Sequence, residues 1–296
     1  MPLIDFLQAT PWAFTATAAT LGLLVGSFLN VVIYRLPRMM EREWRLQCAE
    51  LVENPATSTP ERFDLITPRS RCSNCNHAIA AWENIPVLSY VWLRGKCSAC
   101  GSRISLRYPL VEIFTAVLSA VTACHFGFGW TAGAALLLTW AMIALSFIDY
   151  DHQLLPDSIT LPFLWVGLAL TLFAGSGETI LFATGRNAII GALAGYLSLW
   201  SVYQLFKLLT GKEGMGRGDF KLLGMLGAWL GWQALPVIIL LSSLLGAVVG
   251  MVLILILGRD KNIPIPFGPY LALAGWISLL WGKEITQTYL NFAGLA

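Results

Sequence analysis

Two aspartates are the strongest candidates for chemistry in this sequence. Asp149 ends an apolar run in "LSFIDYDHQLLPD", and Asp219 follows the glycine-rich "GMGRG" at the start of another apolar run. An ionisable side chain at membrane depth is costly unless it is compensated, so such residues are functional candidates. Two neighbouring carboxylates cannot both ionise cheaply and therefore share a proton, so one can activate water while the other protonates a leaving group. The pair would suit acid–base hydrolysis of an amide.

Glycines and further acids flank this pair. Aspartic proteases use paired carboxylates, and Gly216 and Gly218 would let an extended substrate backbone approach Asp219 without interference from Cβ atoms. The GxGD pattern is short, and it gains weight from its membrane context and from the acids of "IDYDHQLLPD". Two of those acids have an ordinary alternative. Asp151 could simply sit in water at the end of a span, and Asp157, which precedes "SITLPF", could be a helix N-cap.

The composition is that of an integral membrane protein. Of the 296 residues, 56% are hydrophobic and only 12% are charged, and the mean hydropathy is +0.67. A soluble protein could not bury that much apolar surface. The apolar runs predict an all-α polytopic fold of about eight transmembrane helices. We expect them over Trp12–Tyr34, Leu110–Phe128, Thr131–Ile148, Ile159–Ala174, Asn187–Leu209, Phe220–Trp232, Leu235–Leu257 and Pro269–Trp281.

The basic residues predict the orientation of these helices. The polar segment 35–107 holds 11 of the 19 Lys and Arg residues. Threading eight spans alternately places 17 of the 19 on the same side, and only Arg186 and Lys283 fall on the other side. The positive-inside rule makes the rich side cytoplasmic and sends both termini outward. Asp149 and Asp219 then share the cytoplasmic face.

Four cysteines in the polar segment form a metal-binding pattern. Cys72-x2-Cys75 is followed after 21 residues by Cys97-x2-Cys100. Zinc needs four ligands that converge tetrahedrally, and each CxxC supplies two thiolates from one tight turn. Because a closed four-thiolate site leaves no open position for substrate, we expect structural zinc in a small zinc-ribbon-like insert.

Other interpretations of the cysteines and histidines remain possible at this stage. The two CxxC pairs could be redox dithiols or disulfides, although a cytoplasmic location disfavours stable disulfides. His77 could replace one ligand, but with four cysteines available an ordinary surface position suits it better. Cys48 and Cys124 have no partner at ligand spacing.

The remaining patterns concern organisation. Three parts are expected: a first transmembrane helix over 1–34, a cytoplasmic insert over 35–107 and a membrane domain over 108–296. In the insert, residues 40–53 suit a short amphipathic helix on the membrane surface, and "NPATSTP" (54–60) suits a linker. The GxxxG spacings, such as Gly22/Gly26 and Gly191/Gly195, predict close helix packing. Tryptophans near the span ends are expected to be interfacial anchors; these are Trp12, Trp130, Trp229, Trp232 and Trp281.

Several segments together resemble one family. "GSFLNVVIYRLP" (26–37), the CxxC pair, "IDYDHQLLPDSITLP" (148–162) and "GMGRGDFKLLGMLGAWLG" (214–231) are similar, in the right order, to the type IV prepilin peptidases. These are bacterial inner-membrane aspartic proteases of the GxGD type. The resemblance implies a two-step enzyme with prepilins and type II secretion pseudopilins as substrates. It would cleave their short basic leader at the cytoplasmic face and then methylate the new N-terminus with S-adenosylmethionine.

The resemblance also implies roles for residues. It places the catalytic dyad on Asp149 and Asp219, supporting roles on the nearby positions, and the family's zinc motif on the four cysteines. The supporting positions are Asp151, Asp157, Lys221, Gly216 and Gly218. No residue can be assigned to the methyl donor, and no glycine-rich loop after a strand supports a Rossmann-type methyltransferase. The partners implied are the substrates and the lipid bilayer, with no nucleic acid.

Two other classes of protein would use some of the same features. A proton-coupled transporter would use membrane acids as a relay, with broken glycine-rich helices around its substrate, but its acids are expected at the midplane. A membrane thiol oxidoreductase would use the CxxC pairs, but it would place them at the oxidising outer face.

Overall fold

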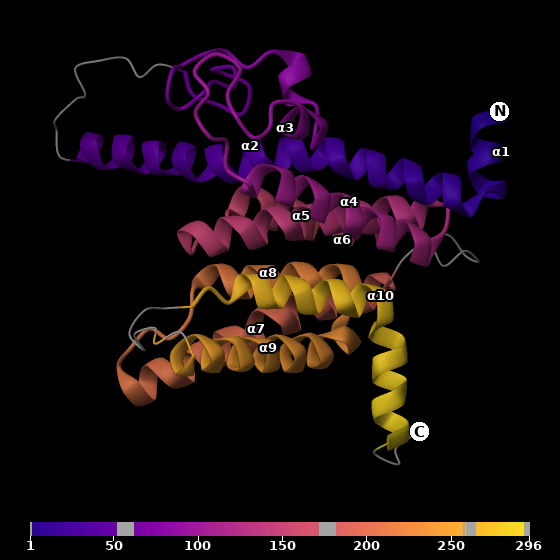
Figure 1. The fold of residues 1–296 in the computed structure, drawn as a ribbon. Helices are drawn as coiled ribbons and strands as arrows, with labels where there is room; N and C mark the ends of the chain where they lie inside the picture. Colours follow the sequence, from indigo (N-terminus) through magenta and orange to yellow (C-terminus); the bar gives the residue numbers. More distant parts are fainter. Residues whose placement is uncertain (1, 52–61, 172–181, 257, 259–264, 293–296) are drawn as a thin grey trace. The chain divides into compact units, whose positions relative to one another are not determined.

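The computed structural model describes residues 2–51, 62–171, 182–256, 258 and 265–292, and Figure 1 shows their course. Within these ranges the regular structure is helical, accompanied by two isolated β-bridges. The all-α class is therefore confirmed for the described part of the chain. Two compact units are formed, Met1–Ala132 and Gly133–Ala296. The "NPATSTP" segment expected to be a linker lies outside the described residues.

Two long helices build the first unit. Helix α2 (Pro11–Leu51), preceded by the short α1 (Pro2–Ala9), packs along α4 (Arg107–Phe126). Glycine permits this approach: a Cβ atom on Gly22 would lie 2.6 Å from Oγ of Ser119, and one on Gly26 would lie 2.7 Å from Cα of Glu112. The close packing predicted from this GxxxG spacing is therefore confirmed.

Helix α2 is longer than the sequence predicted. The sequence predicted a span ending at Tyr34 and a separate surface helix over 40–53, but one helix of 41 residues runs through Pro37 to Leu51. The residues after Pro37 include many good helix formers, and Glu41 and Arg45 form an i,i+4 ion pair at 2.6 Å. The rest of the insert contains the short η1 (Ala81–Asn84) and α3 (Leu88–Trp92).

The described part of the second unit contains six α-helices: α5 (Trp130–His152), α6 (Asp157–Leu170), α7 (Gly185–Thr210), α8 (Arg217–Leu230), α9 (Leu235–Leu255) and α10 (Gly268–Phe292). Each coincides with one predicted span, with shifted ends. Residues 172–174 and Leu257, where two spans were expected to end, lie outside the described residues. Helix α10 continues beyond its expected end at Trp281, where the backbone leaves helical geometry and kinks.

Helix α8 lies at the centre of the second unit. It contacts α6, α7, α9 and α10, and its residues from Asp219 to Leu230 are buried except for Lys221. Gly191 of α7 lies against Gly227 of α8, and a Cβ on Gly191 would clash with the carbonyl oxygen of Gly227. Trp229 is buried rather than an interfacial anchor: its Nε1 donates to the Phe163 carbonyl at 2.7 Å.

Among the described residues, five helices are long and apolar enough to cross a membrane. They correspond to α2, α4, α5, α7 and the segment Trp232–Leu255, which includes α9; α6 is apolar but shorter. This supports the membrane character of the chain. Helix α8 has only 14 residues, so its burial among other helices rather than its length makes it suitable for the interior of a bundle.

Candidate active site and metal centre

Asp149 lies in the last turn of α5 and is only 6% exposed. Its Oδ2 accepts a hydrogen bond of 2.9 Å from the backbone N–H of Gly268, the first residue of α10. The C-terminal end of a helix carries partial negative charge, which disfavours a carboxylate, whereas a helix N-terminus presents unpaired N–H groups. Helix α10 therefore supplies the compensation that α5 itself cannot give.

Asp219 lies in the first turn of α8 and is also 6% exposed. Its helix begins at Arg217 after Gly216, so the carboxylate is near the positive end of the helix dipole. Asp219 interacts electrostatically with Asp149. The two aspartates predicted to form a pair therefore come together in the second unit, although far apart in the sequence.

Leu155, in the turn between α5 and α6, links the segments around this pair. A Cβ on Gly218 would lie 2.7 Å from the Leu155 Cβ, and a Cβ on Gly268 would lie 3.2 Å from Leu155 Cδ2. The same Cβ on Gly268 would lie 2.7 Å from Oδ2 of Asp149. Leu155 is buried at this junction. Glycine at 218 and 268 thus lets α8 and α10 approach the end of α5.

This contact revises the reason for the glycine pattern. Gly216 and Gly218 were expected to give the substrate access to Asp219, but Gly218 is required by its contact with Leu155. At Gly216 a Cβ would meet only Oδ2 of Asp219, at 3.4 Å. Gly268 was missed because its role depends on a contact across 119 residues. Its local signal is the "PFGPY" segment, in which glycine directly precedes a proline at the helix start.

The predicted supporting residues have different surroundings. Lys221 Nζ lies 2.7 and 2.6 Å from the two oxygens of Asp157, which joins α8 to the start of α6. Asp157 is the first residue of α6, and its carboxylate pairs with this lysine instead of acting as an N-cap. Asp151 is exposed near the end of α5.

The four cysteines converge in the first unit. Their Sγ atoms all lie within 4.8 Å of one another, and all four cysteines are free thiols. Tetrahedral zinc with Zn–S bonds of about 2.3 Å separates its sulfurs by about 3.8 Å. The Sγ atoms of Cys72 and Cys100 are 3.9 Å apart, and those of Cys75 and Cys97 are 4.0 Å apart. The donor set and its spacing therefore fit a four-thiolate zinc ion.

Two equivalent turns produce this convergence. In the first, the Cys72 N–H bonds the His77 carbonyl, and Asn76 in a left-handed conformation (φ 56°) donates back to Cys72. In the second turn, the Cys97 N–H donates to the Ser102 carbonyl, and Gly101 (φ 68°) is the counterpart of Asn76. Asparagine and glycine are the residues that tolerate this conformation best.

His77 and the two remaining cysteines are not among the ligands of this centre. His77 Nε2 is 3.5 Å from Glu83 Oε2, and His77 is not among the four converging ligands. Cys48 lies on the exposed end of α2, and Cys124 is exposed on α4. Their predicted exclusion from the metal site agrees with these positions.

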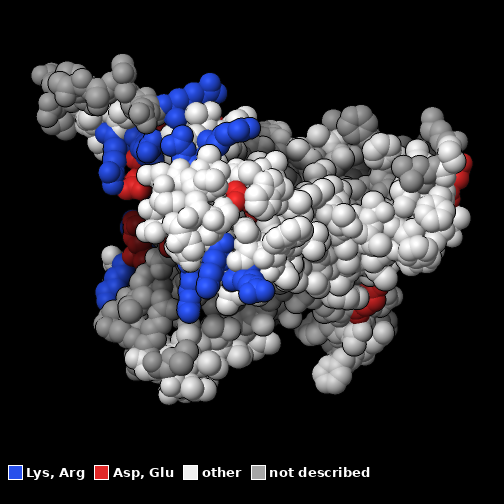
Figure 2. All heavy atoms as spheres, turned by 45° about the horizontal axis from the view of Figure 1, so that its top comes forward, with Lys and Arg blue, Asp and Glu red and all other residues white. Residues whose placement is uncertain are grey.

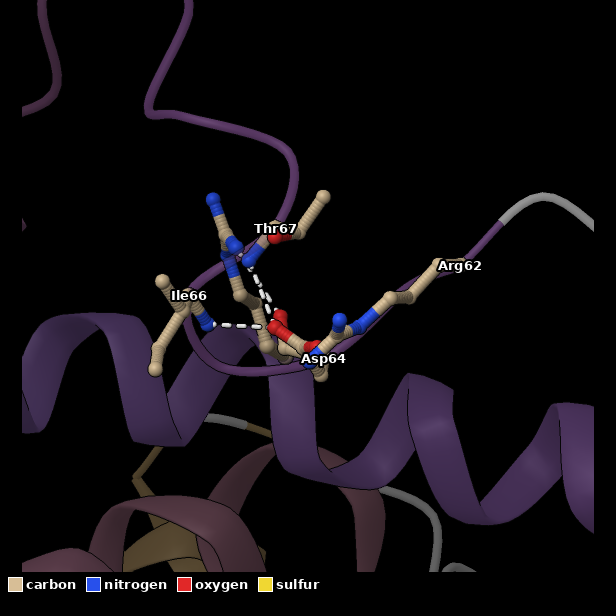
Figure 3. Close-up of polar contacts among 5 residues, drawn as sticks. Arg62, Asp64, Ile66 and Thr67 are labelled. Atoms are coloured by element: carbon tan, nitrogen blue, oxygen red, sulfur yellow. Dashed lines mark hydrogen bonds and ion pairs between the residues drawn. The ribbon is translucent and has the colours of Figure 1, made fainter.

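The segment that begins at Arg62 is held against α2. Asp64 Oδ1 accepts from the N–H groups of Ile66 and Thr67 at 2.7 and 2.6 Å, and Asp64 Oδ2 accepts from Arg62 Nε at 2.6 Å (Figure 3). These bonds, with that from Thr67 the strongest, lower the pKa of Asp64. The buried Arg35 of α2 donates to the carbonyls of residues 64 and 68 at 2.9 and 2.6 Å.

Comparison with protein families gives two matches. Residues 20–126 match the Bacterial Peptidase A24 N-terminal domain, which here covers most of α2, the insert and α4. Residues 136–251 match the Type IV leader peptidase family, and this range includes both aspartates. No solved structure matches the chain.

Relatives match along essentially the whole chain. A protein of Stutzerimonas stutzeri is 59% identical over 295 residues, covering 100% of both chains. One from Pseudomonas aeruginosa is 57% identical over 294 residues (99% of each), and one from Xanthomonas campestris is 48% identical over 290 residues (98% of this chain and 99% of the relative). All three are named prepilin leader peptidase/N-methyltransferase. The chain therefore belongs to the type IV leader peptidase family.

Proposed function

We propose that this protein is a membrane aspartic peptidase that removes the leader of type IV prepilins and then N-methylates the new N-terminal residue. The observation that carries the proposal is the buried Asp149–Asp219 pair, with a hydrogen bond from Gly268 to Asp149. The family membership and the names of the relatives support both activities. Two buried carboxylates that interact with each other are suited to acid–base hydrolysis.

The hydrogen bond from Gly268 divides the roles of the two acids. An N–H group can bond only to a lone pair, so Asp149 Oδ2 is kept as an acceptor. We assign the shared proton to Asp219 and the role of general base to Asp149. Asp149 then takes a proton from a water molecule while the oxygen of that water attacks the scissile carbonyl. Asp219 gives its proton to the leaving nitrogen as the C–N bond breaks, so one water molecule is consumed.

The supporting residues act through the position of Asp219. Lys221 lies two residues after Asp219, and its ion pair with Asp157 fixes the start of α8 against α6. Gly218 permits the contact of the same turn with Leu155. We assign no chemical step to Asp151, because it is exposed near the end of α5.

We further propose that Cys72, Cys75, Cys97 and Cys100 hold a structural zinc ion in a zinc-ribbon-like insert. The support is the convergence of four thiols from two matching turns. A bound zinc ion would cross-link the two turns and stabilise the fold of the insert without offering an open coordination position.

The methyl donor, S-adenosylmethionine, would supply an electrophilic methyl group to the deprotonated N-terminal amine. One hollow of about 270 Å³ lies between Phe63 and the C-terminal part of α2. It does not fit the positive sulfonium, because Arg38, Arg42 and Arg45 line it with a single glutamate, Glu41. The methyl-donor site is therefore not assigned to this hollow.

The finer topology and location are also part of this proposal. Eight spans, the three-part division at 34 and 107, and a cytoplasmic insert and active site follow from the distribution of basic residues. A bacterial inner-membrane location is consistent with this orientation. Type II secretion pseudopilins are proposed as substrates beside the prepilins.

The proposal is tested with purified protein in vesicles and a prepilin substrate. Asp149→Asn and Asp219→Asn should each abolish leader removal, and Asp151→Asn should retain it as the matched control. The mass of the product, measured with and without S-adenosylmethionine, reports methylation of the new N-terminus. If both aspartate variants still remove the leader, the peptidase assignment is wrong.

A further inference from the structure

We propose that the exposed apolar face of α3, in the insert, lies in the interfacial layer of the lipid bilayer and anchors the insert to the membrane surface. The face consists of Leu88, Val91 and Trp92, which are 67%, 68% and 83% exposed. Their spacing of i, i+3 and i+4 puts all three on the same side of the helix. An apolar face of this kind needs a partner, because it leaves large side chains in contact with solvent.

The opposite side of α3 is fixed to the insert. The Tyr90 hydroxyl lies 3.4 Å from the carbonyl oxygen of Ile104, to which it donates. A Cβ on Gly95 would lie 2.7 Å from the Tyr90 hydroxyl oxygen, so glycine is needed for this contact, and its φ of 67° also favours glycine. Tyr90 thus faces inward, and the three apolar residues face away from the rest of the insert.

A hydrogen bond to a membrane helix sets the depth of α3. The backbone N–H of Val87, directly before α3, donates to Oε2 of the buried Glu112 at 2.8 Å. Glu112 lies five residues after Arg107, the start of α4, which is about 7.5 Å along the helix. On the α2 side Glu112 contacts Gly26, which lies about 13.5 Å before Arg35 along the helix. Val87 is therefore held beside α2 and α4 on the membrane side of their first basic residues.

The lipid-facing surface of α4 begins at the same level. Leu110, Ile113 and Phe114, on either side of Glu112 in the sequence, are all exposed. In a membrane protein such large apolar side chains on a spanning helix face lipid. Because Val87, the residue directly before α3, is bonded to Glu112, the apolar face of α3 lies at the depth where this lipid contact begins.

The residues after α3 have the charge expected at a membrane surface. Trp92 is followed by Arg94 and Lys96, which are both exposed. Tryptophan prefers the headgroup level, and lysine and arginine are attracted to anionic lipids. Figure 2 shows blue Lys and Arg side chains next to white surface that carries no charge. This combination favours a bilayer over a soluble partner.

The connection to Glu112 contains two features that are individually costly. Val87 has a φ of 59°, which is strained for a β-branched residue. Glu112 is a carboxyl group buried within a membrane helix. The bond between them joins the two features and fixes where the chain enters α3, and the Glu112 carboxyl group also interacts with the Ser27 side chain. A surface loop without a required depth would not need this arrangement.

The experiment compares the fluorescence of the wild-type protein and Trp92→Phe in vesicles that contain phosphatidylglycerol. The difference between the two gives the emission of Trp92. We expect lipids brominated near the top of the acyl chain to quench most of this emission and aqueous iodide to quench little of it. Trp44→Phe is the matched control: Trp44 is exposed near the C-terminal end of α2, and iodide should quench its emission.

A second variant tests the face rather than the single probe. Leu88→Glu should raise iodide quenching of Trp92 and lower quenching by brominated lipid, while the thiols of the cysteine cluster keep their accessibility. Iodide quenching of Trp92 as strong as that of Trp44, with no effect of brominated lipid, would falsify the proposal. Protection of Trp92 from iodide only after a prepilin is added would assign the face to substrate docking and would also overturn the proposal.

Discussion

The N–H of Gly268 donates to Oδ2 of Asp149 at 2.9 Å, which joins the start of α10 to the end of α5. The bond completes a buried acid site from three helices, because Asp219 is supplied by α8. Two aspartates alone would place two negative groups in a poorly solvated site. The N-terminus of α10 offsets part of that cost and gives the acids different surroundings.

Gly268→Ala should strongly reduce peptidase activity. The added Cβ would lie 2.7 Å from Asp149 Oδ2, so the carboxylate or α10 must move. A displacement of about 1 Å in an active site can lower the rate roughly 100-fold. We expect kcat for leader removal to fall by about this factor with a smaller change in KM, because the substrate-binding surface is retained.

Gly133→Ala is the matched control for this variant. Gly133 lies in α5, the helix that carries Asp149, and apart from the neighbouring backbone of that helix no heavy atom lies within 4 Å of the position of its Cβ. Alanine there should leave kcat unchanged and slightly favour the helix. Equal activity of the Gly268→Ala variant and the wild type would contradict the assigned role of this glycine.

The sequence was sufficient for features that depend on local patterns. The apolar runs located helix α2 and helices α4 to α10, and the CxxC spacing located the thiol cluster. Asp149 and Asp219 were found because an acid next to an apolar run is unusual wherever it occurs. In each case the residue type itself carries the information.

Features that depend on contacts between distant segments could not be predicted. Gly268 resembles many glycines at helix starts, and only the fold places it on Asp149. Trp229 was predicted to be an interfacial anchor because it lies near a span end. It is buried instead, because Gly167 of α6 leaves space for its ring. The continuation of α2 beyond Pro37 was missed because a charged segment after a proline was interpreted as a new element.

Lys221 and Asp157 should act on activity through position rather than chemistry. Asp157→Asn should lower kcat/KM less than tenfold, whereas Asp219→Asn should abolish cleavage. Because the pair is partly exposed, its coupling energy should be only about 0.5 kcal/mol, close to a twofold effect. The exchanged double variant, Asp157→Lys with Lys221→Asp, should recover part of the loss. Complete inactivity of Asp157→Asn in folded protein would indicate a direct chemical role.

The cysteine cluster should contain about one zinc ion per chain, measured by elemental analysis of the purified protein. Cys75→Ser should remove most of this metal, because three remaining thiolates leave the coordination incomplete. Cys48→Ser, which changes an exposed cysteine outside the cluster, should retain it. A metal-free wild-type protein with disulfides between the four cysteines would contradict the zinc assignment.

Asp64 should order the segment that Arg35 holds against α2. Asp64→Ala removes the acceptor for the N–H groups of Ile66 and Thr67, so these amides should exchange with deuterium faster. Asp64→Asn is the control: its Oδ1 can still accept both bonds, and only the Arg62 contact is lost. Exchange in Asp64→Ala no faster than in Asp64→Asn would show that the turn does not depend on this acceptor.

The pH dependence of this turn follows from the same bonds. The N–H groups of Thr67 and Ile66, and then Arg62, lower the pKa of Asp64 below its ordinary value of 3.8. A lowered pKa means that the ionised form stabilises the fold, so the contribution is complete above the ordinary pKa and is lost as the pH falls through the lowered value. Relative to Asp64→Asn, protection of the two amides in the wild type should therefore be constant near neutral pH. It should decrease only in acid below that ordinary value, and a decrease near neutral pH would exclude Asp64 as the titrating group.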